Sequence, residues 1–82
     1  MSSSSSLLSQ LATIWSQALD VETVAAENDF FELGGDSIMV TIMTLQVEEA
    51  FDLVIDPALV FEFPTLAEYA AQIEALRVQP AA

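Results

Sequence analysis

Apolar side chains recur every three or four residues in separate segments of this 82-residue chain. That spacing matches one face of an α-helix, and it predicts helices over residues 7–19, 37–51 and 65–77. β-branched residues in the second segment would also suit a strand, but the segment is longer than a usual strand. A short helical turn is expected over residues 57–61, because Pro57 suits the first position of a helix and Pro64 would end it. The pattern therefore predicts an all-α four-helix bundle with three main helices and a short third helix.

The segments outside this pattern are the chain ends and one long loop. We expect a disordered serine-rich start, a single domain and a loose tail over residues 1–6, 7–77 and 78–82, respectively. Residues 20–36 show no sustained period and are predicted to form a loop. Because structureless connections above about 12 to 15 residues are uncommon in compact domains, we expect Phe30 and Phe31 to pack on the core and the loop to shape a working surface. A plain connector is the alternative interpretation.

The charge of the chain excludes several classes of partner. It contains 13 acidic residues and one basic residue, Arg77, so its formal net charge is -12. Without a basic patch the chain cannot displace counterions from nucleic acid, and an anionic membrane surface repels it. No apolar run approaches the roughly 18 residues of a membrane span. We therefore expect a cytoplasmic monomer with no nucleic-acid or membrane partner, and the extreme charge favours a freestanding protein over a module of a larger protein.

The residue types present also argue against catalysis and against a metal site. The chain has no His and no Cys, which removes Ser–His and thiolate nucleophiles and the commonest metal ligands. The acids Asp29, Glu32 and Asp36 lack the alternating pattern of a calcium-binding loop. The segment from Gly35 to Met39 lacks the closing glycine of a nucleophile elbow. These absences exclude a Ser–His or thiolate nucleophile and a nucleophile elbow, and they predict no catalytic residue of these kinds and no metal ligand.

The junction Leu33-Gly34-Gly35-Asp36-Ser37 precedes the second predicted helix. Two glycines permit a tight reversal with positive φ, and Asp36 is a natural N-cap. Ser37 would lie in the first helical turn, where a phosphate ester would meet the positive end of the helix dipole and an external enzyme could reach the hydroxyl. For the tetrapeptide Gly34-Gly35-Asp36-Ser37 alone, a turn followed by a helix cap is the favoured interpretation.

Over nearly its whole length, the chain resembles the acyl and peptidyl carrier proteins of fatty-acid, polyketide and nonribosomal peptide synthesis. The resemblance rests on Ile14-Trp15, on residues 28–38 and on Phe61-Glu62-Phe63-Pro64-Thr65-Leu66. It implies a four-helix bundle that catalyses nothing itself. It also implies that Ser37, next to Asp36 in the attachment motif, receives 4'-phosphopantetheine from coenzyme A and carries cargo as a thioester on the terminal thiol. The implied partners are a phosphopantetheinyl transferase, a loading enzyme (an adenylation enzyme or an acyltransferase), and a ketosynthase or condensation domain.

A second apolar stripe on the helix over residues 37–51 cannot face the same core as the first. The resemblance implies that partner enzymes dock on this helix. The candidate docking residues, four apolar and two acidic, are Ile38, Met39, Ile42, Leu45, Glu48 and Glu49. Packing against the short third helix or the long loop is the alternative, and for Leu45 the two interpretations are equal. The rival function is an unmodified acidic helical adaptor that binds one protein partner through this helix.

Overall fold

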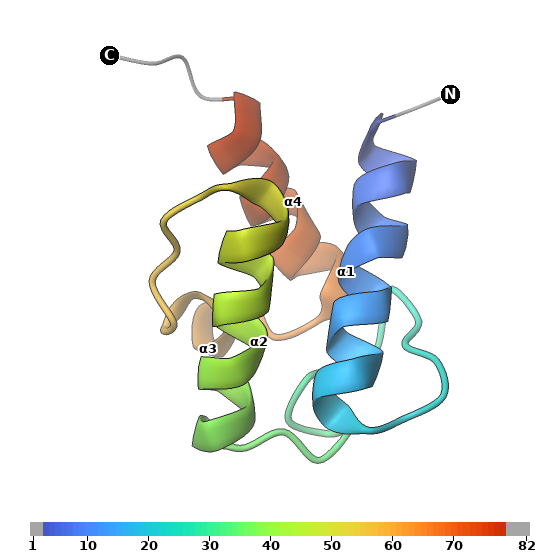
Figure 1. The fold of residues 1–82 in the computed structure, drawn as a ribbon. Helices are drawn as coiled ribbons and strands as arrows, with labels where there is room; N and C mark the ends of the chain where they lie inside the picture. The colour runs from blue at the N-terminus through green and yellow to red at the C-terminus, as the bar shows by residue number, and fades with distance from the viewer. Residues whose placement is uncertain (1–2, 79–82) are drawn as a thin grey trace.

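A computed structural model describes residues 3–78 of the chain. The helices are α1 (Ser3–Leu19), α2 (Ser37–Phe51), α3 (Leu59–Glu62) and α4 (Leu66–Val78). The described residues form no strand, and an isolated bridge pairs Asp29 with Thr65. The first turn of α2 lies at the end of the bundle opposite the start of α1 and the end of α4 (Figure 1). The predicted all-α bundle with a short third helix is confirmed.

Three aromatic side chains from different parts of the chain meet in the core. Trp15 of α1, Phe30 of the long loop and Tyr69 of α4 are fully buried. The ring centroid of Trp15 lies 5.0 Å from that of Phe30, edge to face, and 5.5 Å from that of Tyr69. Such aromatic pairs contribute about 0.5 to 1.5 kcal/mol beyond the area they bury. The periodicity of α1, which predicts Trp15 in the core, is confirmed.

Backbone hydrogen bonds join the long loop over residues 20–36 to the segment that leads into α4. The amide of Phe30 donates a hydrogen bond of 2.8 Å to the carbonyl oxygen of Pro64, and the amide of Leu66 donates one of 3.1 Å to that of Asn28. Phe30 is fully buried and Phe31 is half-buried. The prediction that the loop packs its aromatic residues on the core is therefore confirmed.

The start of α1 corrects one expectation. The helix begins at Ser3, so the described part of the serine run, residues 3–6, is helical where disorder was expected. Leu7 and Leu11 are buried and anchor the first turns, and serine costs little helix propensity compared with glycine or proline. At the other end α4 reaches Val78, one residue into the expected tail. Residues 1–2 and 79–82 lie outside the described residues.

The ends of α3 and α4 follow local capping. Helix α3 starts two residues later than expected because Asp56 first forms a turn, in which its carboxylate oxygen Oδ1 accepts a hydrogen bond of 2.9 Å from the amide of Ala58. The capping box predicted at the start of α4 is present: the amide of Glu68 donates to the hydroxyl oxygen of Thr65 at 3.2 Å, and the amide of Thr65 to the Glu68 carboxylate at 3.4 Å. Within residues 3–78, every helix is too short or too polar to cross a bilayer.

Candidate functional site

The two glycines before α2 serve different purposes. Gly34 has a φ of +104°, a conformation that other residues rarely adopt. Gly35 does not share it; instead a Cβ there would collide with the ring of Phe30 and would lie 2.7 Å from the carbonyl oxygen of Phe30. The predicted positive φ is therefore found at Gly34 alone, and Gly35 is needed for a close approach to the core. Together they turn the chain from the buried Phe30 to the exposed start of α2.

Asp36 and Ser37 occupy the start of α2 as predicted. The Asp36 carboxylate accepts a hydrogen bond of 2.9 Å from the amide of Met39, and the Asp36 carbonyl oxygen accepts one from the amide of Val40. Asp36 is therefore the N-cap of the helix. Ser37 is exposed, and its hydroxyl makes no hydrogen bond with any described residue. The hydroxyl oxygen is thus presented at the positive end of the helix dipole with access from outside.

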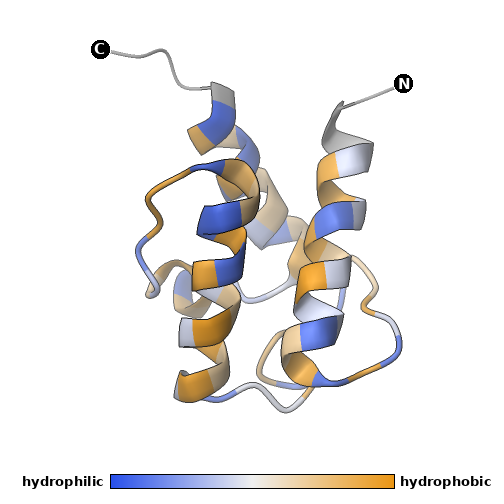
Figure 2. Cartoon of the chain, in the orientation of Figure 1, coloured by the Kyte–Doolittle hydropathy of each residue, from blue (hydrophilic) through white to orange (hydrophobic). Residues whose placement is uncertain are grey.

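The second apolar stripe of α2 is solvent-exposed. Ile38, Ile42 and Leu45 are 69%, 44% and 56% exposed, respectively. For Leu45, this favours the docking interpretation over packing against neighbouring segments. Hydrophobic residues follow the face of α2 seen in Figure 2. We call these three residues the docking face.

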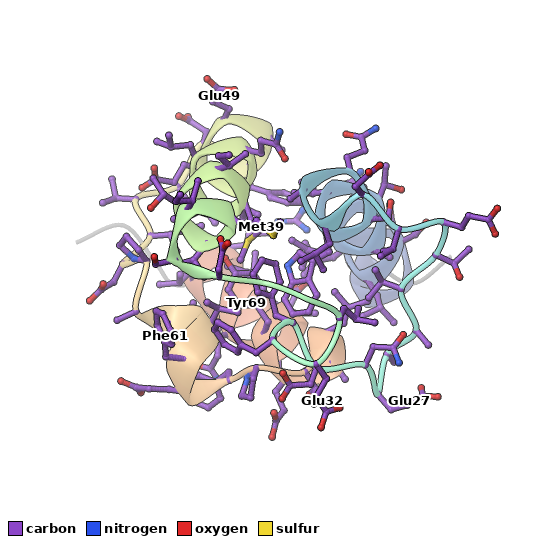
Figure 3. All side chains as sticks on the ribbon, turned by 90° about the horizontal axis from the view of Figure 1, so that it is seen from below. Glu27, Glu32, Met39, Glu49, Phe61 and Tyr69 are labelled. Carbon is purple, nitrogen blue, oxygen red and sulfur yellow. The ribbon has the colours of Figure 1, made fainter. Side chains whose placement is uncertain are left out.

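The other three docking candidates differ among themselves. Glu49 is exposed and points away from the bundle, whereas Met39 is half-buried and its side chain points inward (Figure 3). Glu48 is also half-buried, and its carboxylate oxygen Oε2 accepts a hydrogen bond of 2.8 Å from the amide of Ile55. The structure therefore places Glu49 beside the docking face and turns Met39 and Glu48 toward the interior.

Two exposed apolar residues near α3 were missed by the sequence analysis. Val54 is 93% exposed and Phe61 is 57% exposed. The Phe61 ring stacks on that of Phe31, with centroids 5.0 Å apart, and Phe61 lies on the outer side of α3 (Figure 3). Val54 directly precedes the buried Ile55, and the sequence of this aperiodic connection carries no signal that tells which of the two side chains enters the core.

The start of α2 has no basic group of its own. Arg77, the only basic residue of the chain, lies at the end of α4, 5.5 Å from the ring centroid of Phe51 and 4.0 Å from the Glu74 carboxylate. The described residues contain no cluster of potential metal ligands. In the interior, burial raises the pKa of the Tyr69 phenol, and the charge of Glu48 raises it further. Arg77 lies toward the end of the bundle opposite the first turn of α2 (Figure 1).

Comparison with known proteins gives consistent matches. A family model described as a phosphopantetheine attachment site matches residues 9–73. One of the linear gramicidin synthase proteins of Brevibacillus parabrevis is 42% identical over 71 residues, which cover 87% of this chain and 1% of that protein. The chain thus spans about 1% of the length of the first curated relatives.

Solved structures share the fold. BlmI, a type II acyl carrier protein from Streptomyces verticillus involved in bleomycin biosynthesis, superposes with a TM-score of 0.85 at 30% identity, covering 88% of this chain and 87% of that one. A peptidyl carrier protein in complex with the phosphopantetheine transferase Sfp and coenzyme A gives a TM-score of 0.80 at 25% identity, covering 84% of this chain and 90% of that one.

Proposed function

Because this chain belongs to the family of phosphopantetheine attachment domains, we propose that its prosthetic arm is joined to Ser37. The chain is a carrier that holds intermediates on 4'-phosphopantetheine and catalyses no step itself. The observation that supports Ser37 is its exposed hydroxyl in the first turn of α2, directly after the glycine turn and the capping Asp36. Ser37 also matches the attachment serine of the motif by which the sequence resembles these carriers.

Arm attachment transfers the phosphopantetheine group from coenzyme A to the hydroxyl oxygen of Ser37. The Ser37 oxygen forms a bond to the phosphorus of the pantetheine arm, the bond from that phosphorus to the nucleotide half of coenzyme A breaks, and the nucleotide leaves. The chain has no His to take the proton of the hydroxyl, and we assign this proton to a basic group on the transferase. The new phosphodiester is then stabilised by the helix dipole of α2.

Asp36 contributes to the site by fixing the start of α2. Its carboxylate accepts a hydrogen bond from the amide of Met39, and its carbonyl oxygen accepts one from the amide of Val40. These two bonds hold the first helical turn in place around Ser37. Replacing an N-cap of this kind costs about 1 kcal/mol. We assign Asp36 a supporting role in arm attachment through this cap.

Partner enzymes dock on α2 in this proposal. The docking face of Ile38, Ile42 and Leu45 supplies apolar contact, while exposed Glu49 attracts basic groups and raises the encounter rate. The proposed partners are a phosphopantetheinyl transferase, an adenylation enzyme or acyltransferase that loads cargo, and a ketosynthase or condensation domain that uses it. The carrier acts as a cytoplasmic monomer, since copies of net charge -12 repel one another.

Intact-mass measurement tests Ser37 as the attachment residue. The chain is incubated with coenzyme A and the transferase Sfp, and the wild type is expected to gain the mass of one phosphopantetheine arm. Ser37→Ala should gain nothing, while the matched control Ser9→Ala, an exposed serine of α1, should gain the arm as the wild type does. An arm on Ser37→Ala would contradict the assignment, and an unmodified wild type would favour the adaptor.

A further inference from the structure

Glu48 holds the connection between α2 and α3. Its carbonyl oxygen accepts from the amides of Asp52 and Leu53, and its carboxylate accepts from the amide of Ile55 at 2.8 Å. Among the described residues, the hydrogen bonds that join residues 53–58 to α2 all end on Glu48. Beyond Leu53, the carboxylate of Glu48 is therefore the polar contact that fixes where this connection runs.

The contact falls on the peptide unit between a buried and an exposed residue. Ile55 is 4% exposed, whereas Val54 is 93% exposed. Because the amide of this peptide is directed at Glu48, the peptide cannot rotate without losing a charge-assisted hydrogen bond, which is stronger than a neutral one. The carboxylate thereby keeps Ile55 in the core and Val54 in solvent.

The same connection sets the position of α3. Asp56 forms the turn that starts α3, with its carbonyl oxygen accepting from the amide of Leu59 at 2.9 Å. The exposed Phe61 follows two residues later and stacks on Phe31. Among the described residues, the exposed large hydrophobic side chains are the three of the docking face, Val54 and Phe61, so all of them lie on α2, on the connection that follows it or on α3.

We propose that Glu48 is a positioning residue, whose carboxylate fixes residues 53–58 and α3 so that Val54 and Phe61 are presented, together with the docking face, to the phosphopantetheinyl transferase. This inference rests on the proposed function, because it needs partners that dock beside Ser37. It changes the role expected of Glu48 from the sequence. Glu49 is exposed and attracts the partner through its charge, whereas Glu48 acts through the backbone that it holds.

Steady-state kinetics of modification by Sfp, with the carrier as the varied substrate, test the proposal. Glu48→Ala removes the acceptor and is expected to raise KM for the carrier by about two- to thirtyfold, the range of residues that modulate coupling without contacting the ligand, while kcat stays unchanged. Glu48→Gln keeps an acceptor oxygen for the amide of Ile55 and should restore most of the affinity. Glu49→Gln removes one charge from the same edge, so its KM should match that of Glu48→Gln.

NMR of the same variants provides a readout at the contact itself. The amide proton signal of Ile55 is expected to shift upfield in Glu48→Ala and to stay close to its wild-type position in Glu48→Gln and Glu49→Gln. A Glu48→Ala chain with wild-type KM, with lost helical content, or with the same KM as Glu48→Gln would overturn the inference. A wild type that Sfp does not modify would instead overturn the proposed function, so the two failures are distinguishable.

Discussion

At the scale of single residues, Tyr69 combines full burial with an unpartnered hydroxyl. The side chain is 0% exposed, and its oxygen has no hydrogen-bond partner among the described residues. Leaving a buried polar group unpaired costs about 1 to 3 kcal/mol. The ring, by contrast, packs against Trp15. The aromatic body of Tyr69 therefore stabilises the core, and its hydroxyl opposes that stabilisation.

The free energy of unfolding at alkaline pH should depend on Tyr69. Burial, followed by the charge of Glu48, raises the pKa of Tyr69 above its ordinary value. The unfolded chain therefore ionises first, so the stabilisation is complete below about pH 10 and is lost as the pH rises through the folded pKa. We expect the free energy of unfolding in urea to fall above about pH 10 in the wild type and to fall less in Tyr69→Phe, which should also be about 1 kcal/mol more stable at neutral pH.

The ultraviolet absorbance of tyrosinate provides the matching control. The chain has one Tyr, so the phenolate band reports Tyr69 alone. In the folded chain this band should appear only at a higher pH than in urea-unfolded chain. Titration of the folded chain at the ordinary tyrosine pKa would show that the hydroxyl reaches solvent and would contradict this account.

The start of α2 shows what a motif does and does not predict about residues. The exposed Ser37 and the capping Asp36 were predicted, because capping depends on local residue types that the sequence displays. The separate roles of the glycines were not predicted. The requirement at Gly35 comes from the ring of Phe30, and such a close approach depends on tertiary packing rather than on the neighbouring residues.

At the scale of elements, periodic segments were predicted well and aperiodic ones poorly. Helices α1, α2 and α4 each carry an apolar stripe with helical spacing, which the core then buries. The serine run has no period, so the helical turn at Ser3 was missed. Glu48 was assigned to docking because helical register gives the direction of a side chain but not the loop that meets it. The path of the connection whose Ile55 amide donates to Glu48 depends on tertiary packing, which the sequence pattern does not display.

A charge placed on the docking face of α2 tests whether this element meets the transferase. Ile42 is 44% exposed, so Ile42→Glu should fold while placing an additional carboxylate where apolar contact is proposed. We expect kcat/KM for modification by Sfp to fall about tenfold, equivalent to about 1.4 kcal/mol, with the helical circular dichroism signal unchanged.

Gln17→Glu is the matched control for the added charge. Gln17 is an exposed residue of α1, away from the docking face, and this variant should be modified as fast as the wild type. Equal losses in both variants would attribute the effect to net charge alone. A loss of helical signal in Ile42→Glu would instead identify Ile42 as a core residue.

At the scale of the whole molecule, thirteen acids and one base share a chain with a radius of gyration of 11.8 Å. This radius is comparable to the Debye length at 0.1 M salt, about 10 Å. Like charges at such distances repel in the folded state and separate on unfolding. The apolar core must therefore offset a repulsion energy that depends on the salt concentration. This repulsion arises from all the charges together and cannot be assigned to one residue.

Thermal unfolding in NaCl should measure that penalty. Raising NaCl from 0.02 to 0.5 M shortens the Debye length several-fold, so the wild-type unfolding midpoint should rise by roughly 5 °C, equivalent to about 1 kcal/mol for a chain of this size. The triple variant Glu22→Gln, Glu27→Gln, Glu32→Gln removes three exposed acids and leaves the core intact. Its midpoint should be higher at low salt and should rise less with NaCl. Equal salt slopes for the two chains would mean that salt acts on apolar hydration, since both bury the same core, and not on charge repulsion.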